Sequence, residues 1–281
     1  MVGDVDSHHH IWTLARGDYG WLTPRLAPLY RDFTLADLRP ALARAGIAAT
    51  VLVQAAPSEA ETRFLLAAAG ASAGLVQGVV GWVDMAAPDA PARIAALARD
   101  PLLKSLRPML QDITDDAWML DPRLDPAFRA LIELGLCFDA LVQPRHLPFL
   151  LRLIERYPEL PVVIDHGAKP RIAERLIEPW AADIGAIARH TRAWCKLSGL
   201  VTEARPDWRA EDVRPYVARL LEEFGPERLM WGSDWPVVNL AGGYKRWRGA
   251  TLELLRELQD GERRAILGAN AVAFYGLGYA G

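Results

Sequence analysis

The sequence predicts an α/β fold in which eight parallel strands alternate with helices and close into a (β/α)8, or TIM, barrel. Strand-like and helix-like segments alternate along all 281 residues. The strand-like segments are continuous apolar runs, which is typical of a parallel sheet covered on both faces. Eight such repeats match the usual size of this barrel. No linker or low-complexity run divides the chain, so residues 1–281 are predicted to form a single domain.

The predicted strands are short runs rich in Val, Ile and Leu. The first contains Val2 and Val5 and continues into polar residues. No glycine fingerprint follows it, which disfavours a dinucleotide-binding doubly wound sheet. The other predicted strands are residues 50–53, 75–83, 102–109, 136–142, 161–166, 193–197 and 228–234.

Helices are predicted where apolar residues recur at helical spacing between turn residues. Thr34 caps the first, in which Leu35, Leu38 and Leu42 share one face. Pro179 is expected to kink or break a later one. The other predicted helices are a segment beginning at Ser58 and residues 91–98, 128–134, 146–157, 172–190, 212–224, 252–259 and 262–274. The loop at residues 13–32 is too long for a plain connection and is interpreted as a functional lid.

Composition restricts the classes of partner. The chain has 32 basic and 35 acidic residues and a net charge of −3, which argues against a nucleic-acid-binding protein. No apolar run is long enough to cross a membrane, and acidic Asp4 and Asp6 lie where a signal peptide would be basic. Two cysteines, Cys137 and Cys195, lie in apolar runs and are expected to be reduced core residues of a cytoplasmic protein. Whether the chain forms a homo-oligomer stays open.

A polar cluster at the end of the first strand is the leading candidate site. In Asp6-Ser7-His8-His9-His10, strand alternation places His8 and His10 on one face and His9 on the other. Two imidazoles so placed can bind one metal ion or polarise one carbonyl oxygen. An expression tag or a solvated loop are the alternatives, but a tag is usually longer and lacks the apolar Ile11 and Trp12 beside it.

Further polar residues follow other predicted strands, where the active sites of such barrels lie. Individually, His166 could be a core histidine, Asp234 could cap a turn and Arg107 could form a structural ion pair. Together they indicate a shared site at the barrel mouth. The residues at strand ends are His8, His10, Gln54, Trp82, Arg107, Gln143, His166 and Asp234.

Three motifs carry a resemblance to a known family. They are Asp6-x-His8-x-His10, the stretch Ile164-Asp165-His166-Gly167-Ala168-Lys169-Pro170 and the stretch Trp231-Gly232-Ser233-Asp234-Trp235-Pro236. With these the chain resembles the amidohydrolase superfamily over nearly its whole length, and more narrowly its lactonase branch, which acts on L-fucono- and L-rhamnono-type lactones and on 2-pyrone-4,6-dicarboxylate. The resemblance implies a TIM barrel and a lactone substrate.

The metal content stays open in this comparison. Many amidohydrolases bridge two metals with a carboxylated lysine on the fourth strand and a histidine on the fifth, where this chain has Arg107 and Gln143. A binuclear centre is therefore not expected. His8, His10, His166 and Asp234 could bind one divalent ion, with zinc (Zn²⁺) the expected metal, or the site could work with no metal, as in some lactonases of this branch.

Lactone hydrolysis assigns a role to each candidate. Asp234 is expected to be the general base, with a pKa raised by burial. His8, His10 and His166 would polarise the carbonyl. The alternatives are a metal-dependent decarboxylase of an aromatic or unsaturated acid and a non-catalytic binding barrel. Substrate contacts are predicted for Arg107, Lys169, Gln54, Gln143, Trp12, Trp82 and Trp235.

Overall fold

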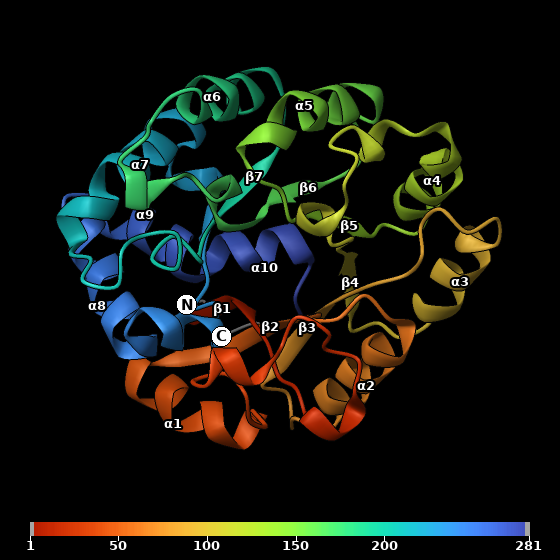
Figure 1. Ribbon diagram of the computed structural model, residues 1–281, viewed down its shortest axis with the longest axis horizontal. Helices are drawn as coiled ribbons and strands as arrows, with labels where there is room; N and C mark the ends of the chain where they lie inside the picture. Colours follow the sequence, from red (N-terminus) through yellow and green to blue (C-terminus); the bar gives the residue numbers. More distant parts are fainter. Residues whose placement is uncertain (1–2, 279–281) are drawn as a thin grey trace.

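A computed structural model describes residues 3–278 and contains the predicted barrel (Figure 1). Its eight strands form one parallel sheet in the order β1 to β8. The edges of β1 and β8 are joined because Asp234 N donates to His8 O at 2.8 Å and His10 N donates to Trp235 O at 2.7 Å. The strands are β1 Asp4–His9, β2 Ile47–Val53, β3 Val76–Gly81, β4 Leu103–Leu106, β5 Cys137–Ala140, β6 Val162–Ile164, β7 Trp194–Leu197 and β8 Leu229–Trp231.

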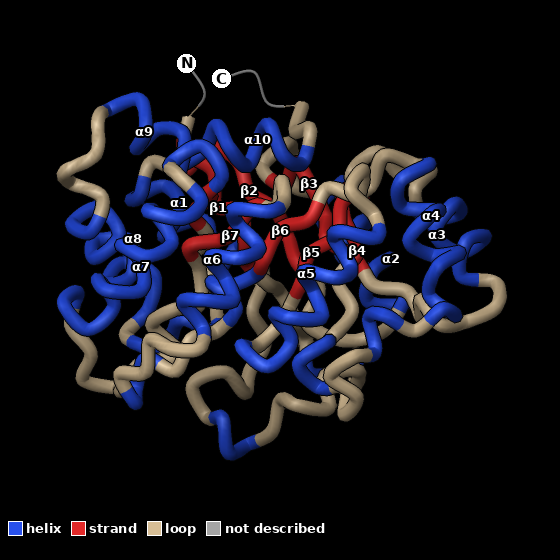
Figure 2. Tube along the Cα trace, turned by 90° about the horizontal axis from the view of Figure 1, so that it is seen from above, coloured by secondary structure: helices blue, strands red, loops and turns tan. Residues whose placement is uncertain are grey.

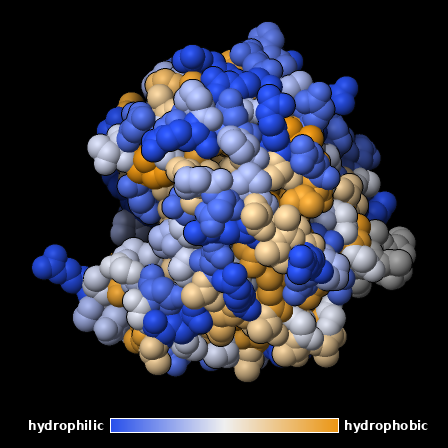
Figure 3. Space-filling model, turned by 90° about the vertical axis from the view of Figure 1, so that its right-hand side faces the viewer, coloured by the Kyte–Doolittle hydropathy of each residue, from blue (hydrophilic) through white to orange (hydrophobic). Residues whose placement is uncertain are grey.

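Helices surround these strands, except that the last, α10, lies over the middle of the ring (Figure 1). They are α1 Leu35–Ala45, α2 Glu59–Gly70, α3 Ala90–Leu97, α4 Asp125–Glu133, α5 Leu147–Arg156, α6 Trp180–His190, α7 Ala210–Phe224, α8 Gly243–Leu254, α9 Asp260–Arg264 and α10 Asn270–Tyr275. Within residues 3–278, no helix has both the length and the apolar character needed to cross a membrane. The face on the α3 and α4 side carries hydrophilic side chains interspersed with smaller apolar areas (Figure 3).

The two ends of the barrel differ in what closes them. Helix α10 lies across one end, and the long loops that follow the strands lie at the other (Figure 2). A buried cluster of α10 and six strands fills the α10 end, and we call it the apolar plug. Its members are Val5, Ala49, Val51, Val53, Val80, Cys137, Val163, Met230, Ala271, Phe274, Tyr275 and Leu277.

The architecture confirms the predicted fold, and the structure differs from two helix predictions in extent. The segment 172–190 contains a short 3-10 helix, Ile172–Glu174, a turn through Arg175 at φ 58°, and then α6, which begins directly after the predicted break at Pro179. The helix predicted over 252–259 is instead α8, which begins at Gly243 and ends at Leu254. Gly242, at φ 95°, lies just outside this helix and allows the turn into it. One domain over residues 1–281 stays a prediction, supported by the single sheet.

Candidate active site

Four polar side chains from three strands meet at the loop end of the barrel. The ring centroid of His8 lies 4.9 Å from that of His10 and 4.5 Å from that of His166. Asp234 Oδ1 lies 3.3 Å from His10 Nε2 and 3.8 Å from His8 Nε2. All four residues are buried. The structure therefore brings together the four residues that the sequence predicts as the catalytic and metal-binding set.

The contact between the ends of β1 and β8 sets this geometry. A Cβ atom on Gly232 would lie 2.6 Å from His8 Cβ, so only glycine allows the two strands to approach this closely. The Asp6 carboxylate accepts a hydrogen bond from Ser233 N at 2.8 Å and fixes the turn that presents Asp234. Asp6 of the first motif thus orders the turn after β8.

The turns after β6 and β8 place His166 and Asp234 in the left-handed region, at φ 56° and 58°. Histidine and aspartate are among the few non-glycine residues found there. His166 Nδ1 lies 2.8 Å from Ser198 Oγ at the end of β7, which fixes the orientation of the ring. A Cβ atom on Gly199 would lie 2.4 Å from His166 Nδ1, so glycine leaves the space that the imidazole fills.

Deeper in the barrel, four buried charged residues form a network that we call the charged layer: Arg107, Asp139, Asp165 and Lys196. Lys196 Nζ lies 2.5 Å from Asp139 Oδ2 and 3.0 Å from Asp165 Oδ1. Arg107 Nη1 donates to Asp165 Oδ2 at 3.1 Å. The two cations thus neutralise the two carboxylates of this layer. The Asp234 carboxylate of the site is not part of this network.

His8 connects the charged layer to the site. Its Nδ1 lies 3.2 Å from Lys196 Nζ and its Nε2 lies 3.3 Å from Arg107 Nη1. Both cations can only donate hydrogen bonds, so they favour an uncharged ring between them. Burial, with the charge of Lys196 adding to it, accordingly lowers the pKa of His8 well below its usual value.

The protonation states at the site differ from one part of the sequence prediction. Burial lowers the pKa of His166 to about 4, so this ring is neutral at physiological pH. Burial alone would raise the pKa of Asp234, but the imidazoles of His166 and His10 and the charge of Lys169 outweigh it and lower that pKa. The raised pKa predicted for Asp234 is therefore wrong, because these neighbours stabilise the carboxylate.

A cavity of about 220 Å³ opens above this cluster. Five of the predicted site residues line it: His10, Arg107, His166, Lys169 and Asp234. The other lining residues are Trp21, Ala55, Met109, Gln111, Asp112, Leu141, Thr202 and Val237. His8 lies directly beneath, with no exposed surface.

Five predicted substrate contacts lie elsewhere, and their role stays a prediction. Gln54 holds Arg107, because its Nε2 donates to Arg107 O at 2.8 Å and its own carbonyl oxygens accept from the guanidinium. Gln143 N donates to His146 Nδ1 at 2.9 Å at the start of a short helix. These two glutamines support other residues and do not line the cavity.

The three predicted tryptophans also lie outside the cavity lining. Trp12 is fully buried and its indole donates to Arg31 O at 2.8 Å. Trp235 packs edge-on against Phe33, with ring centroids 5.3 Å apart. Trp82 lines a neighbouring hollow. Core packing is the role that the structure supports for Trp12 and Trp235.

Sequence reasoning missed Trp21, Gln111 and two members of the charged layer. Asp139 and Lys196 are each the one charged residue in an otherwise apolar predicted strand. Because a charge in a buried strand needs a partner of opposite sign, this pattern could have identified them as a pair. Gln111 lies in the loop after β4, and Trp21 lies in the loop at residues 13–32. Sequence patterns do not predict the direction of a side chain in such loops.

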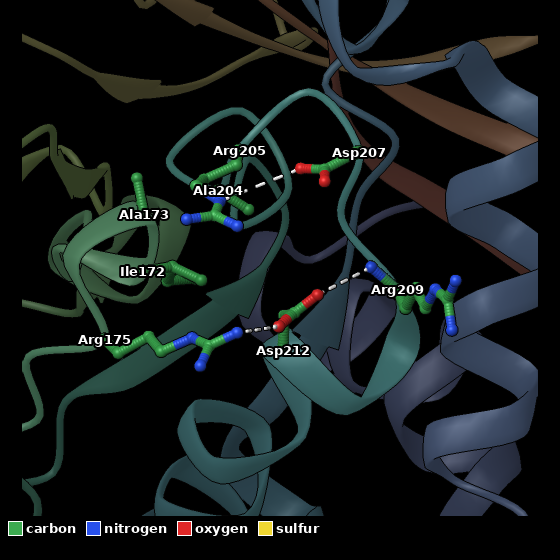
Figure 4. Close-up of a pocket in the computed structure, with 8 residues that line it drawn as sticks. All are labelled: Ile172, Ala173, Arg175, Ala204, Arg205, Asp207, Arg209 and Asp212. Carbon is green, nitrogen blue, oxygen red and sulfur yellow. Dashed lines mark hydrogen bonds and ion pairs between the residues drawn. The ribbon is translucent and has the colours of Figure 1, made fainter.

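Another hollow, of about 300 Å³, lies beside the start of α7 (Figure 4). Two of its three arginines are paired with carboxylates: Arg175 Nη2 lies 3.5 Å from Asp212 Oδ1, and Arg205 Nε lies 3.8 Å from Asp207 Oδ1. These side chains are largely exposed, and none of the predicted site residues lines the hollow. Its lining therefore lacks the imidazoles and the Asp234 carboxylate that form the site at the barrel mouth.

The residues at the barrel mouth fit a divalent metal ion. Donor atoms of His8, His10 and Asp234 lie within 4.8 Å of one another and are buried. His10 Nδ1 lies 2.8 Å from Val53 O, an outer contact typical of metal-binding histidines because it directs the other nitrogen to the ion. A second group, His8, Asp165 and His166, shares His8 with the first, and its carboxylate is already paired with Arg107 and Lys196.

Comparisons with known proteins agree with this geometry. A family model described as Amidohydrolase matches residues 5–277. An L-fucono-1,5-lactonase of Burkholderia ambifaria is 47% identical over 280 residues, covering 98% of this chain and 96% of that protein. An L-fucono-1,5-lactonase of Burkholderia multivorans is 35% identical and covers 97% and 96%.

Solved structures give the same result. An amidohydrolase from Burkholderia multivorans with bound zinc is 34% identical and superimposes with a TM-score of 0.92, covering 98% of this chain and 99% of that one. A 5-carboxyvanillate decarboxylase from Sphingomonas paucimobilis is 15% identical with a TM-score of 0.66, which shows a shared fold only.

Proposed function

Because the chain belongs to the amidohydrolase family, we propose that it opens a sugar lactone of the L-fucono-1,5-lactone type to the sugar acid. The observation that carries the proposal is the ionised Asp234 at the floor of a cavity that also contains Arg107 and Lys169. Two curated relatives with nearly full-length matches and the name L-fucono-1,5-lactonase support the substrate class.

Asp234 is the general base of this proposal. Its Oδ1 faces His8 and His10, and its Oδ2 has no ion-pair partner among residues 3–278, so Oδ2 is free to accept a proton from water. The resulting hydroxide adds to the lactone carbonyl carbon, and the ring C–O bond then breaks. Protonated Asp234 returns its proton to the leaving ring oxygen, which yields the hydroxy acid.

Other residues would hold the substrate. Arg107 and Lys169 provide positive charge for the carbonyl oxygen and the product carboxylate. Gln111 accepts a hydrogen bond from Lys169 Nζ at 2.6 Å, which directs that amine toward the cavity wall. Trp21 is the aromatic ring on this wall, and its indole donates to Ala55 O at 2.7 Å, so its face is fixed before substrate binds.

We further propose that the metal is zinc, bound by His8, His10 and Asp234, with His166 beside them. The zinc-bound relative and the nitrogen and oxygen donors support this choice. Such an ion, when bound, would polarise the lactone carbonyl. A cytoplasmic location is also part of the proposal, supported by the free, buried cysteines Cys137 and Cys195.

The alternative functions have less support. The decarboxylase named above shares only the fold with this chain. A non-catalytic barrel would have no use for a buried carboxylate beside three imidazoles, since such groups cost free energy to bury. Neither alternative is favoured over the lactonase.

The test is a pH-indicator assay of the purified protein with a panel of aldonolactones, before and after chelation. Acid release from L-fuconolactone, lost on chelation and restored by zinc, is the expected result. Acid release that chelation leaves unchanged would retain the lactonase and remove the metal from the reaction. Carbon dioxide release from an aromatic acid, with no acid release from any lactone, would replace this proposal with the decarboxylase.

A further inference from the structure

A second hollow, of about 420 Å³, adjoins the reaction cavity. The segment after β3, with Trp82 and Asp84, lines one side of it, and the loop after β4, with Trp118, lines another. Met109 and Asp112 line both this hollow and the reaction cavity. A molecule bound in the cavity could therefore extend past these two side chains into the hollow.

Two tryptophans in this hollow have free indole N–H groups. Of the ten tryptophans, six donate this group to a protein acceptor: Trp12, Trp21, Trp180, Trp208, Trp231 and Trp247. Within residues 3–278, Trp82 and Trp118 have no such acceptor, although both are half-buried. A tryptophan in this state offers a flat apolar face together with an available hydrogen-bond donor.

The backbone of Trp82 is fixed in place. Trp82 follows the last residue of β3. Its backbone N donates to Thr62 Oγ1 at 2.8 Å, and Thr62 Oγ1 donates to Trp82 O at 2.9 Å. Thr62 is buried on α2. Because this backbone is fixed before a ligand binds, binding at Trp82 orders only the side chain.

The charges of the two spaces differ. The reaction cavity contains the cations Arg107 and Lys169 beside its carboxylates, whereas the second hollow, as lined by residues 3–278, contains Asp84 and the shared Asp112 and no basic residue. Carboxylates accept hydrogen bonds from hydroxyl groups and repel phosphates and carboxylates. The ligand that fits is therefore neutral and rich in hydroxyls, with an apolar face.

We propose that this hollow is a subsite for a second, neutral sugar ring attached to the lactone, so that glycosylated aldonolactones are substrates. The inference rests on the proposed lactonase function. One face of the added ring lies against Trp82 or Trp118, and its hydroxyls donate to Asp84 and Asp112. The lactone ring itself stays beside Asp234.

The test compares L-fuconolactone with derivatives that carry a β-galactosyl group on each free hydroxyl in turn. We expect at least one derivative to have a tenfold higher kcat/KM than the parent. Trp118→Ala should remove this advantage and leave kcat/KM of the parent within twofold. Trp194→Ala is the matched control, because Trp194 is half-buried at the α10 end and also lacks an indole acceptor within residues 3–278.

Slower hydrolysis of every glycosylated derivative than of the parent would overturn the subsite and retain the lactonase. No hydrolysis of the parent would instead contradict the lactonase proposal. A measurement independent of turnover then decides on the subsite: tryptophan fluorescence during titration with lactose. A saturable change that disappears in Trp118→Ala supports the subsite, and an identical response in both proteins refutes it.

Discussion

The two ends of the barrel interior belong to one sheet and contain opposite kinds of side chain. At the α10 end, the apolar plug packs Val51, Val163 and Met230 against the terminal helix. At the loop end, β1, the end of β6 and β7 present His8, Asp165 and Lys196, which are equally buried. Burial is thus common to both ends, and the pairing of charges distinguishes them.

This difference between the two ends separates the source of stability from the source of activity. Apolar burial stabilises the fold directly, whereas a buried ion pair gives little net stability because desolvation offsets the attraction. The charged layer is therefore retained for what it does to the site: its two cations, Lys196 and Arg107, fix His8 as an uncharged ring. Each prediction below changes one end and measures both stability and rate.

The largest expected effect is that of Asp234→Asn. Loss of a general base should lower kcat by about 10⁴-fold, because Asp112, the other carboxylate of the cavity among residues 3–278, has no ion pair with His10. Thermal unfolding should stay nearly unchanged, and the measurement is kcat alongside the melting temperature. A variant with near-native turnover would remove Asp234 from the mechanism.

Lys196→Met should break the charged layer. It leaves Asp139 and Asp165 without their shared cation, which should cost about 4 kcal/mol of unfolding free energy and also lower kcat through His8. Met230→Ala is the matched control in the apolar plug, with a cost of about 3 kcal/mol and an unchanged kcat in the folded fraction. Urea unfolding and steady-state rates distinguish the two, and equal rate losses would contradict a separate role for each end.

Glu61 tests whether a paired cation decides the protonation state of a buried carboxylate. It accepts from Ala55 N and Ala56 N but has no cation partner within residues 3–278, and burial raises its pKa to about 7. The folded protein binds this proton more tightly than the unfolded chain, so stability from Glu61 falls as pH rises from about 4.3 to 7. Over that range, Glu61→Gln should abolish a loss of about 3 kcal/mol. Urea unfolding at pH 5 and 8 measures it, and parallel pH curves for both proteins would refute it.

The smallest effect belongs to a hydrogen bond that joins the apolar plug to the charged layer. Tyr275 of α10 donates from its hydroxyl to Asp139 Oδ2 at 2.8 Å. Tyr275→Phe keeps the ring in the plug and should cost about 1 kcal/mol, with kcat lowered less than twofold. Differential scanning calorimetry with parallel assays tests this. A tenfold loss of kcat would instead make α10 part of the active site.

Much of the fold and the central site could be predicted from sequence. Strand runs and the motifs around His8, His166 and Asp234 are local patterns, and a barrel brings strand ends to one place whatever the loops do. The predictions that failed depend on contacts between distant segments. The pKa of Asp234 depends on Lys169, and the wall of the cavity depends on how Trp21 folds over the barrel mouth.

The tryptophans show this limit most clearly. Trp12 follows the first motif directly and lies in the core, whereas Trp21 lies nine positions later in the lid loop and faces the cavity. Both are large aromatic residues beside turn-forming neighbours, and periodicity does not extend through a loop. In the structure the two rings pack edge-on, with centroids 5.4 Å apart. Trp12 lies on the core side of this contact, and Trp21 lies on the side of the cavity.

The left-handed backbone at His166 and Asp234 has an evolutionary consequence. A side chain in this region costs about 1 kcal/mol or more, and glycine would relieve that cost. Replacing either residue by glycine would relieve this backbone cost and would also remove a side chain of the site. Selection for turnover therefore keeps a costly backbone conformation at positions 166 and 234.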